Sequence, residues 1–159
     1  MLQKLMVNNE RTRLLLIERV LLLKSLSIFG DTPETILAEI AHLMQEEEVA
    51  EDTRIVSEGD AGNCMYIIFK GSVKVHKEHQ LLAVLEEKDF FGELSLLDTE
   101  TRSASVTTLS DCILFRIDQE PFYDMMESRP EVGRGVIQIL CKRLRAANQK
   151  MLELTRQNW

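Results

Sequence analysis

Two charged side chains and the small residues between them have the chemistry to bind an anion. Glu93 follows Gly92, and Arg102 comes nine residues after Glu93, just before a run of small and apolar residues. A guanidinium is a planar donor that suits phosphate oxygens, and a carboxylate accepts a hydrogen bond from a hydroxyl. The first amides of a short helix beginning near Glu93 would add further donors. This pattern predicts a ligand that carries both a phosphate and a sugar hydroxyl.

The neighbouring residues predict how these two side chains are held. Phe90 and Phe91 provide a buried strand end, and Gly92 permits a close backbone approach or a positive φ. The helix expected over 93–97 is too short to be stable by itself, so packing must hold it. From residue 103 the chain is expected to return into a strand.

The stretch 92–104, from Gly-Glu-Leu to Arg-Ser-Ala, resembles the phosphate-binding cassette of cyclic nucleotide-binding domains. That family includes protein kinase A regulatory subunits, cyclic-nucleotide-gated channels and bacterial catabolite activators. The resemblance implies that Glu93 accepts from the ribose 2′-hydroxyl and that Arg102 pairs with the exocyclic phosphate oxygens. Ser95 stands where many members have alanine. The implied ligand-binding residues are Gly92, Glu93, Leu94, Ser95, Arg102 and Ser103.

The resemblance also implies a lid and a hinge. The last helix of the family swings over the base, so Ala147, Asn148 and Trp159 are candidates for base contacts. Leu96 and Phe122 stand where the family has its apolar hinge contact, and core packing explains both equally well. The expected ligand is cAMP rather than cGMP, on family frequency alone. The hydroxyl of Ser103 does not decide between adenine and guanine.

Composition predicts one domain in the cytoplasm. The 159 residues carry a formal net charge of −7, which argues against general affinity for nucleic acid or anionic membranes. Cys64, Cys112 and Cys141 each lie in an apolar run, so buried free thiols are expected in a reducing compartment. No signal or transit peptide is evident.

Residues 1–45 are expected to form a helical lead-in. The apolar stretch 11–29 contains Glu18, Arg19 and Lys24, so a helix buried against the domain or a neighbour is expected, not a membrane span. It is also similar to the lead-in helix of bacterial members fused to membrane proteins. Asp31-Thr32-Pro33-Glu34 predicts the start of a second helix. The run 46–48 of three glutamates ends its pattern and indicates a solvated surface.

Residues 46–117, with the cassette over 91–106, predict a β-roll. Apolar and polar residues alternate in short runs separated by glycine-containing turns, which favours an antiparallel jelly roll over a parallel sheet. The fold class expected is mainly β with flanking helices: N-terminal helices before the roll and two C-terminal helices after it. The strands are expected at 54–57, 65–70, 72–77, 81–86, 103–109 and 112–117.

Residues 118–159 are expected to form the hinge and lid helices. The last helix carries apolar residues at alternating spacings of four and three, a pattern that suits a coiled-coil seam or packing on the roll itself. A homodimer through this helix is therefore expected, or a fused or partner effector domain that supplies the output. The stripe comprises Gly133, Ile137, Leu140, Leu144, Ala147, Met151 and Leu154.

No pattern in the chain indicates catalysis. A jelly roll can hold a catalytic metal, but His42, His76 and His79 are too few, and they fall in a helix and around a hairpin turn. No nucleophile is paired with a base. The expectation is a binding module without metal, cofactor, nucleic-acid contact or membrane insertion. The alternative is an unliganded β-roll that serves as a dimerisation or docking module of a larger protein.

Overall fold

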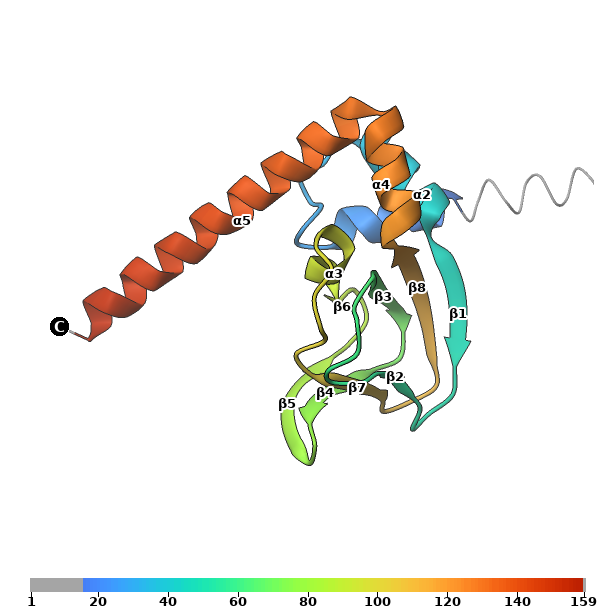
Figure 1. The fold of residues 1–159 in the computed structure, drawn as a ribbon, viewed down its shortest axis with the longest axis vertical. Coiled ribbons are helices and arrows are strands. Elements are labelled where there is room, and N and C mark those ends of the chain that lie inside the picture. Colours follow the sequence, from blue (N-terminus) through green and yellow to red (C-terminus); the bar gives the residue numbers. More distant parts are fainter. Residues whose placement is uncertain (1–15, 159) are drawn as a thin grey trace, which may run out of the picture.

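The computed structural model describes residues 16–158 and places helices over one end of a β-roll (Figure 1). One four-stranded antiparallel sheet has the strand order β1-β8-β3-β6, and a second has the order β2-β7-β4-β5. The predicted antiparallel roll with flanking helices is confirmed. The strands are β1 (Gln45–Val49), β2 (Arg54–Val56), β3 (Cys64–Lys70), β4 (Val73–Lys77), β5 (Gln80–Leu85), β6 (Phe90–Phe91), β7 (Ser105–Thr108) and β8 (Cys112–Asp118).

Strand β3 shows why the core divides in two. Because successive side chains on a strand point to opposite faces, Met65 and Ile67 face the helices, while Tyr66 and Ile68 face the other sheet. Both faces are buried, so this strand appears in the sequence as an almost continuous apolar run. One cluster lies under the helices and the other lies between the sheets.

Strand β1 was not predicted. Glu46 and Glu48 are exposed as expected and Glu47 is half-buried, but all three lie in a strand paired along its whole length with β8. The strand is at the edge of its sheet, where charged side chains discourage pairing with other chains. Oε1 of Glu47 lies 3.8 Å from Nη1 of Arg116. Nε of the same arginine lies 2.6 Å from Oδ1 of Asp118.

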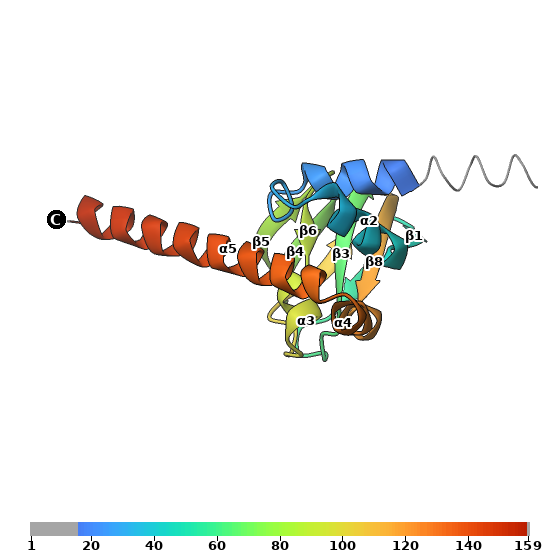
Figure 2. The same cartoon turned by 90° about the horizontal axis from the view of Figure 1, so that it is seen from above.

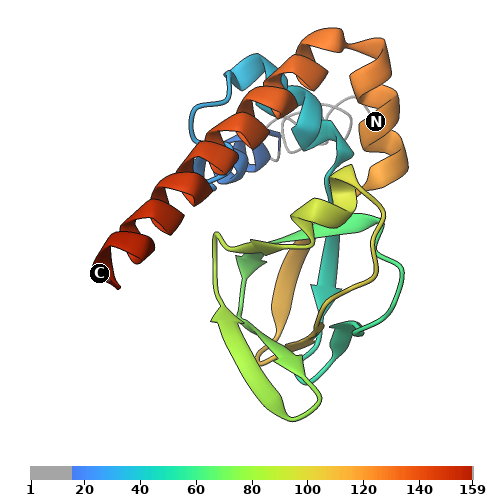
Figure 3. The ribbon, with the colours of Figure 1, turned by 60° about the vertical axis from the view of Figure 1, so that its left-hand side comes forward.

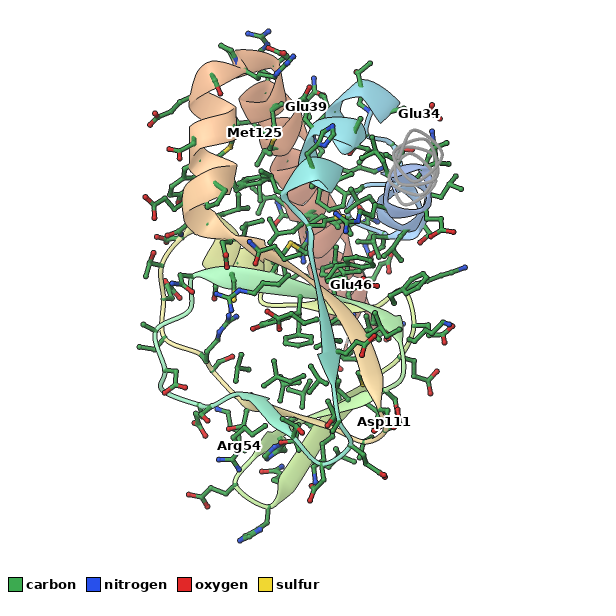
Figure 4. The ribbon with its side chains drawn as sticks, turned by 90° about the vertical axis from the view of Figure 1, so that its right-hand side faces the viewer. Glu34, Glu39, Glu46, Arg54, Asp111 and Met125 are labelled. Carbon is green, nitrogen blue, oxygen red and sulfur yellow. The ribbon has the colours of Figure 1, made fainter. Side chains whose placement is uncertain are left out.

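The helical layer consists of residues 16–25, α2 (Glu34–Leu43), α4 (Gln119–Ser128) and the first part of α5 (Pro130–Gln157). Leu22 and Leu23 are the buried residues of the first helix, whereas Ile17 and Leu21 stay exposed. Residues 11–15 of that predicted segment lie outside the described part of the chain. In Figure 4, Glu39 and Met125 mark this layer, and Arg54 and Asp111 mark the opposite end of the roll.

Helix α5 leaves the body of the molecule (Figures 1 and 2). Val132 and Val136 are buried, but every side chain from residue 140 to residue 158 is exposed. The predicted apolar stripe from Leu144 to Leu154 therefore does not pack on its own roll. The expectation that Cys141 is buried is wrong for the same reason, although Cys64 and Cys112 are buried free thiols. Within residues 16–158, no helix has the length and apolarity needed to cross a bilayer.

Candidate ligand-binding site

Arg102 is clamped at its backbone and at its side chain. Its N–H donates to the carbonyl of Asp60 at 2.7 Å, and its own carbonyl accepts from the N–H of Gly59 at 2.8 Å. The guanidinium Nη2 donates to the carbonyl of Cys64 at 2.8 Å and lies 3.3 Å from the same residue's Sγ. Nη1 donates to Ser95 Oγ at 3.3 Å. The head group is therefore fixed in place before any ligand arrives.

Gly92 makes room for that head group. It links β6 to α3 (Glu93–Leu97) with a φ of 78°, a conformation that other residues adopt at a cost. A Cβ at this position would lie 2.3 Å from Arg102 Nη1 and 2.8 Å from the carbonyl of Cys64. The cassette therefore needs glycine here for its φ and for the space. The sequence had left those two roles as alternatives.

A hollow of about 400 Å³ lies beside the cassette. Residues 91–95 and 100–104 of the cassette line it, together with the apolar side chains of Val56, Val75 and Val106 from the second sheet. Arg102 and Glu93 both line it, so the structure brings the two predicted charged residues to one cavity. Gly92, Leu94, Ser95 and Ser103 line it as well. Figure 3 shows α3 where the roll meets the helical layer.

The charges in this hollow are unbalanced. Arg102 is only 9% exposed, yet its partners among residues 16–158 are a carbonyl, a thiol and a hydroxyl, all neutral. A buried cation without a counter-ion is costly, so an anion that reached the guanidinium would gain from it. Glu93 is paired elsewhere: its Oε1 lies 3.3 Å from Nη2 of Arg143 on α5.

The cassette amides are partly engaged. The N–H of Ser95 donates to the carbonyl of Gly92 at 3.1 Å, so this amide already has an acceptor. In the described residues the amides of Glu93 and Leu94 have none, because they lie in the first turn of a five-residue helix. The side chain of Leu94 is 65% exposed at the rim.

Tyr66 packs against Phe91 at the start of the cassette. It is buried in β3 and stacks on Phe91, with the ring centroids 5.1 Å apart. Burial, with a smaller contribution from the neighbouring Cys64, raises the pKa of Tyr66 to about 12. The hydrogen bond to Asp118 raises the pKa of Arg116, which lies on the strand paired with β3.

Two of the three candidate lid residues are not at this hollow. Ala147 and Asn148 lie on the projecting, exposed part of α5 and are absent from the hollow's lining. Their contact with a base stays a prediction that requires α5 to move. Trp159, the third candidate, lies outside the described residues.

The candidate hinge residues lie in the same part of the core. Leu96 and Phe122 are 3% and 2% exposed and belong to the same core cluster. Both line a small apolar crevice, which Val136 and Leu140 border from α5. This arrangement agrees with plain core packing as well as with a hinge, so the hinge role stays a prediction.

A second hollow, of about 600 Å³, lies beside the β4–β5 hairpin. His76 and His79 line it, as expected for residues around that turn, but His76 is buried there. Its Nδ1 faces the carbonyl of Glu78 at 3.1 Å and its Nε2 faces Thr107 Oγ1 at 2.8 Å, so both ring nitrogens have partners. Residues 16–158 contain no group of three or more His, Cys, Asp or Glu side chains arranged to hold a metal.

Sequence reasoning missed several residues of the site. Cys64 holds Arg102 through a backbone carbonyl, a contact across 38 residues that no local pattern reveals. Arg143 looked like a solvated charge on the last helix, and only the packing of α5 brings it to Glu93. The three valines were detectable in principle, since each occupies an inward position of an alternating strand.

The sequence matches a known family over more than half of its length. Residues 46–129 fit the sequence profile described as the cyclic nucleotide-binding domain. Over 132 residues the chain is 27% identical to the CRP-like cAMP-activated global transcriptional regulator of Mycobacterium tuberculosis, covering 80% of this chain and 59% of that one. It thus spans less than two thirds of this relative.

Two further similarities agree with this match. The chain is 26% identical over 144 residues to human cGMP-dependent protein kinase 2, covering 86% of this chain and 19% of the kinase. The N-terminal domain of a transcriptional regulator from Streptomyces coelicolor A3(2) has the same fold, with a TM-score of 0.75 and 29% identity, covering 82% of this chain and 94% of that one. Fold, cassette geometry and sequence profile agree, and the chain therefore belongs to the cyclic nucleotide-binding domain family.

Proposed function

We propose that this chain is a regulatory module that binds cAMP in preference to cGMP and passes the binding event to its C-terminal helices. The observation that carries the proposal is the buried Arg102 guanidinium, which faces the cassette hollow with neutral partners only. The preference for cAMP is supported by the name of the M. tuberculosis relative, a cAMP-activated regulator.

Each polar group of the hollow has one role in this proposal. Arg102 pairs with the exocyclic phosphate oxygens, and the free amide of Leu94 donates to the same phosphate. Glu93 accepts from the ribose hydroxyl, and the three valines contact the apolar faces of sugar and base. Ser103 lies at the rim with an exposed hydroxyl. The module acts by binding and has no catalytic step.

The output depends on α5. When the ligand is bound, α5 would move so that Ala147 and Asn148 approach the base, with Leu96 and Phe122 as the hinge contact. The regulated output then belongs to a fused domain, a partner or a second copy. The expectations of a cytoplasmic location and of no nucleic-acid contact stay predictions. The relative named a transcriptional regulator is matched over only part of its length.

The test is a titration of the purified chain with cAMP, cGMP and 5′-AMP, read as a thermal shift and by calorimetry. Ligand at about 100 times its Kd stabilises a protein by about 2.7 kcal/mol, an easily measured shift. We expect the largest shift with cAMP, a smaller one with cGMP and none with 5′-AMP. No shift with either cyclic nucleotide would contradict the proposal.

Arg102→Ala makes the test specific. Removing one partner of a desolvated charge pair costs about 2–5 kcal/mol, so we expect affinity to fall by tens to thousands of fold. Arg145→Ala is the matched control, because Arg145 is exposed on α5 and has no ion pair among residues 16–158. Equal affinity in the wild type and in Arg102→Ala would remove Arg102 from the site.

A second role is favoured by the exposed stripe on α5. Leu144, Met151 and Leu154 are 63%, 67% and 53% exposed, at the four-and-three spacing of a coiled-coil seam. An apolar stripe of this kind commonly marks an interaction surface. We propose a homodimer through α5, and the alternative of an unliganded dimerisation module predicts this dimer without any nucleotide shift.

A further inference from the structure

Two ion pairs fasten α5 to the rest of the molecule beyond its buried first turns. Lys142 pairs with Asp31 in the loop before α2, and Arg143 pairs with Glu93 at 3.3 Å. Within the described chain, only the second of these pairs reaches the cassette. Arg143 therefore connects the projecting helix directly to the carboxylate that lines the hollow.

The contact between Arg143 and Glu93 changes the charge balance at the hollow. Among the lining residues, Glu93 and Glu100 are negative and Arg102 alone is positive, so the lining has one more negative than positive charge. An anionic ligand would enter a cavity that partly repels it, in a chain whose net charge is −7. Arg143 offsets the charge of Glu93 and brings this local balance close to neutral.

The contact also leaves room for a ligand on the same carboxylate. Arg143 Nη2 approaches Oε1 of Glu93, and in residues 16–158 the other oxygen, Oε2, has no hydrogen-bond partner. A carboxylate can accept several hydrogen bonds at once. Glu93 is 22% exposed, so its side chain has some freedom that a second contact would restrict.

We propose that Arg143 is a positioning residue of the nucleotide site, acting through Glu93. It holds the carboxylate so that Oε2 accepts from the sugar hydroxyl, and it reduces the repulsion of the anionic ligand. Because coupling between two sites is reciprocal, a bound nucleotide also strengthens the contact between Arg143 and Glu93, and α5 keeps this contact when it moves towards the base. This inference rests on the proposed cyclic nucleotide binding. It adds Arg143 to the site and a coupling between the bound nucleotide and α5.

The experiment is a double-mutant cycle between the two residues, with cAMP affinity measured by calorimetry in about 50 mM salt. We expect Arg143→Gln to weaken binding about three- to fivefold, the range of a partly exposed ion pair. In the Glu93→Gln background, where the charge is already gone, the same change should weaken binding by about twofold or less.

Three controls separate this role from a structural one. Arg143→Lys should retain part of the affinity, because it keeps the charge without the planar fork. Arg145→Gln makes the same charge change two residues further along α5, on a different side of the helix, and should bind like the wild type. At about 0.5 M salt the difference between the wild type and Arg143→Gln should shrink, since screening weakens a partly exposed pair.

The outcomes distinguish this inference from the proposed function. Failure of the wild type to bind either cyclic nucleotide would overturn both. Binding by the wild type that Arg143→Gln leaves unchanged would overturn the role of Arg143 alone. So would an Arg143→Gln effect of equal size in both backgrounds, because it would not pass through Glu93.

Discussion

The cassette and the outer part of α5 present opposite kinds of surface. The cassette carries charged groups whose positions are fixed by other parts of the fold, such as the bonds from Arg102 to Cys64 on β3 and to Ser95 on α3. The outer part of α5, residues 144–157, carries apolar side chains that no tertiary contact within residues 16–158 buries, and side-chain hydrogen bonds there join residues four apart, such as Gln149 and Glu153. The cassette surface is polar and its side chains are fixed by hydrogen bonds. The α5 surface is apolar and its side chains are exposed to solvent.

This difference indicates what each surface needs. A fixed cation in a cavity loses little further entropy when a small anion binds, so the cassette suits a small ligand. Burying a stripe of exposed leucine and methionine side chains lowers the free energy in proportion to the apolar area removed from water. The α5 stripe therefore suits another protein surface or a second copy. Arg143 lies where the two regions meet.

Gly92→Ala should give the largest loss of stability, because it changes the backbone position that accommodates the fixed guanidinium of Arg102. Alanine would have to adopt the positive φ of Gly92, and its methyl group would clash with the guanidinium of Arg102. We expect the free energy of unfolding to fall by about 1–3 kcal/mol and cAMP affinity to fall more than tenfold. Chemical denaturation and calorimetry measure the two effects.

Gly133→Ala is the matched control on the α5 side. Gly133 lies inside the helix, and a Cβ there would meet nothing within 4 Å. Alanine is the better helix former, so the free energy of unfolding should rise by about 0.5–1 kcal/mol with affinity unchanged. Equal losses of stability in the two glycine variants would contradict the contrast between the regions.

Tyr66→Phe should change how stability depends on alkaline pH. The pKa of Tyr66 is raised to about 12 in the folded chain, from 10.0 when exposed. Its contribution is therefore complete below pH 10 and lost as pH rises towards 12, because the unfolded chain gives up the phenol proton first. Between pH 10 and 12 the wild type should lose about 2 kcal/mol more than Tyr66→Phe, measured by denaturant unfolding. Parallel curves would show that the phenol titrates alike in both states.

Leu144→Gln combined with Met151→Gln should have the smallest effect on the fold. Both side chains are more than half exposed, so the free energy of unfolding at low protein concentration should change by less than about 0.5 kcal/mol. Association should be lost, which light scattering after size-exclusion chromatography measures. A wild type that stays monomeric at high concentration would contradict the proposed dimer.

The β-roll could be predicted because its sequence pattern and its burial agree. Strand β3 is apolar on both faces, and the turns between strands carry glycine. Strand β1 could not be predicted, because an edge strand with exposed glutamates has the composition of a solvated loop. Helix α5 was predicted as a helix, but whether its stripe packed on the roll depended on the direction in which the chain leaves α4.

The sequence alone determined the family, the fold class and the pair Glu93 and Arg102, because these depend on residue types at short and fixed spacings. Only the tertiary structure decided that Cys64 fixes Arg102 and that Arg143 reaches Glu93, contacts across 38 and 50 residues. Local periodicity specifies which face of an element is buried. It does not specify which distant side chain lies against that face, since this depends on how all the elements pack together.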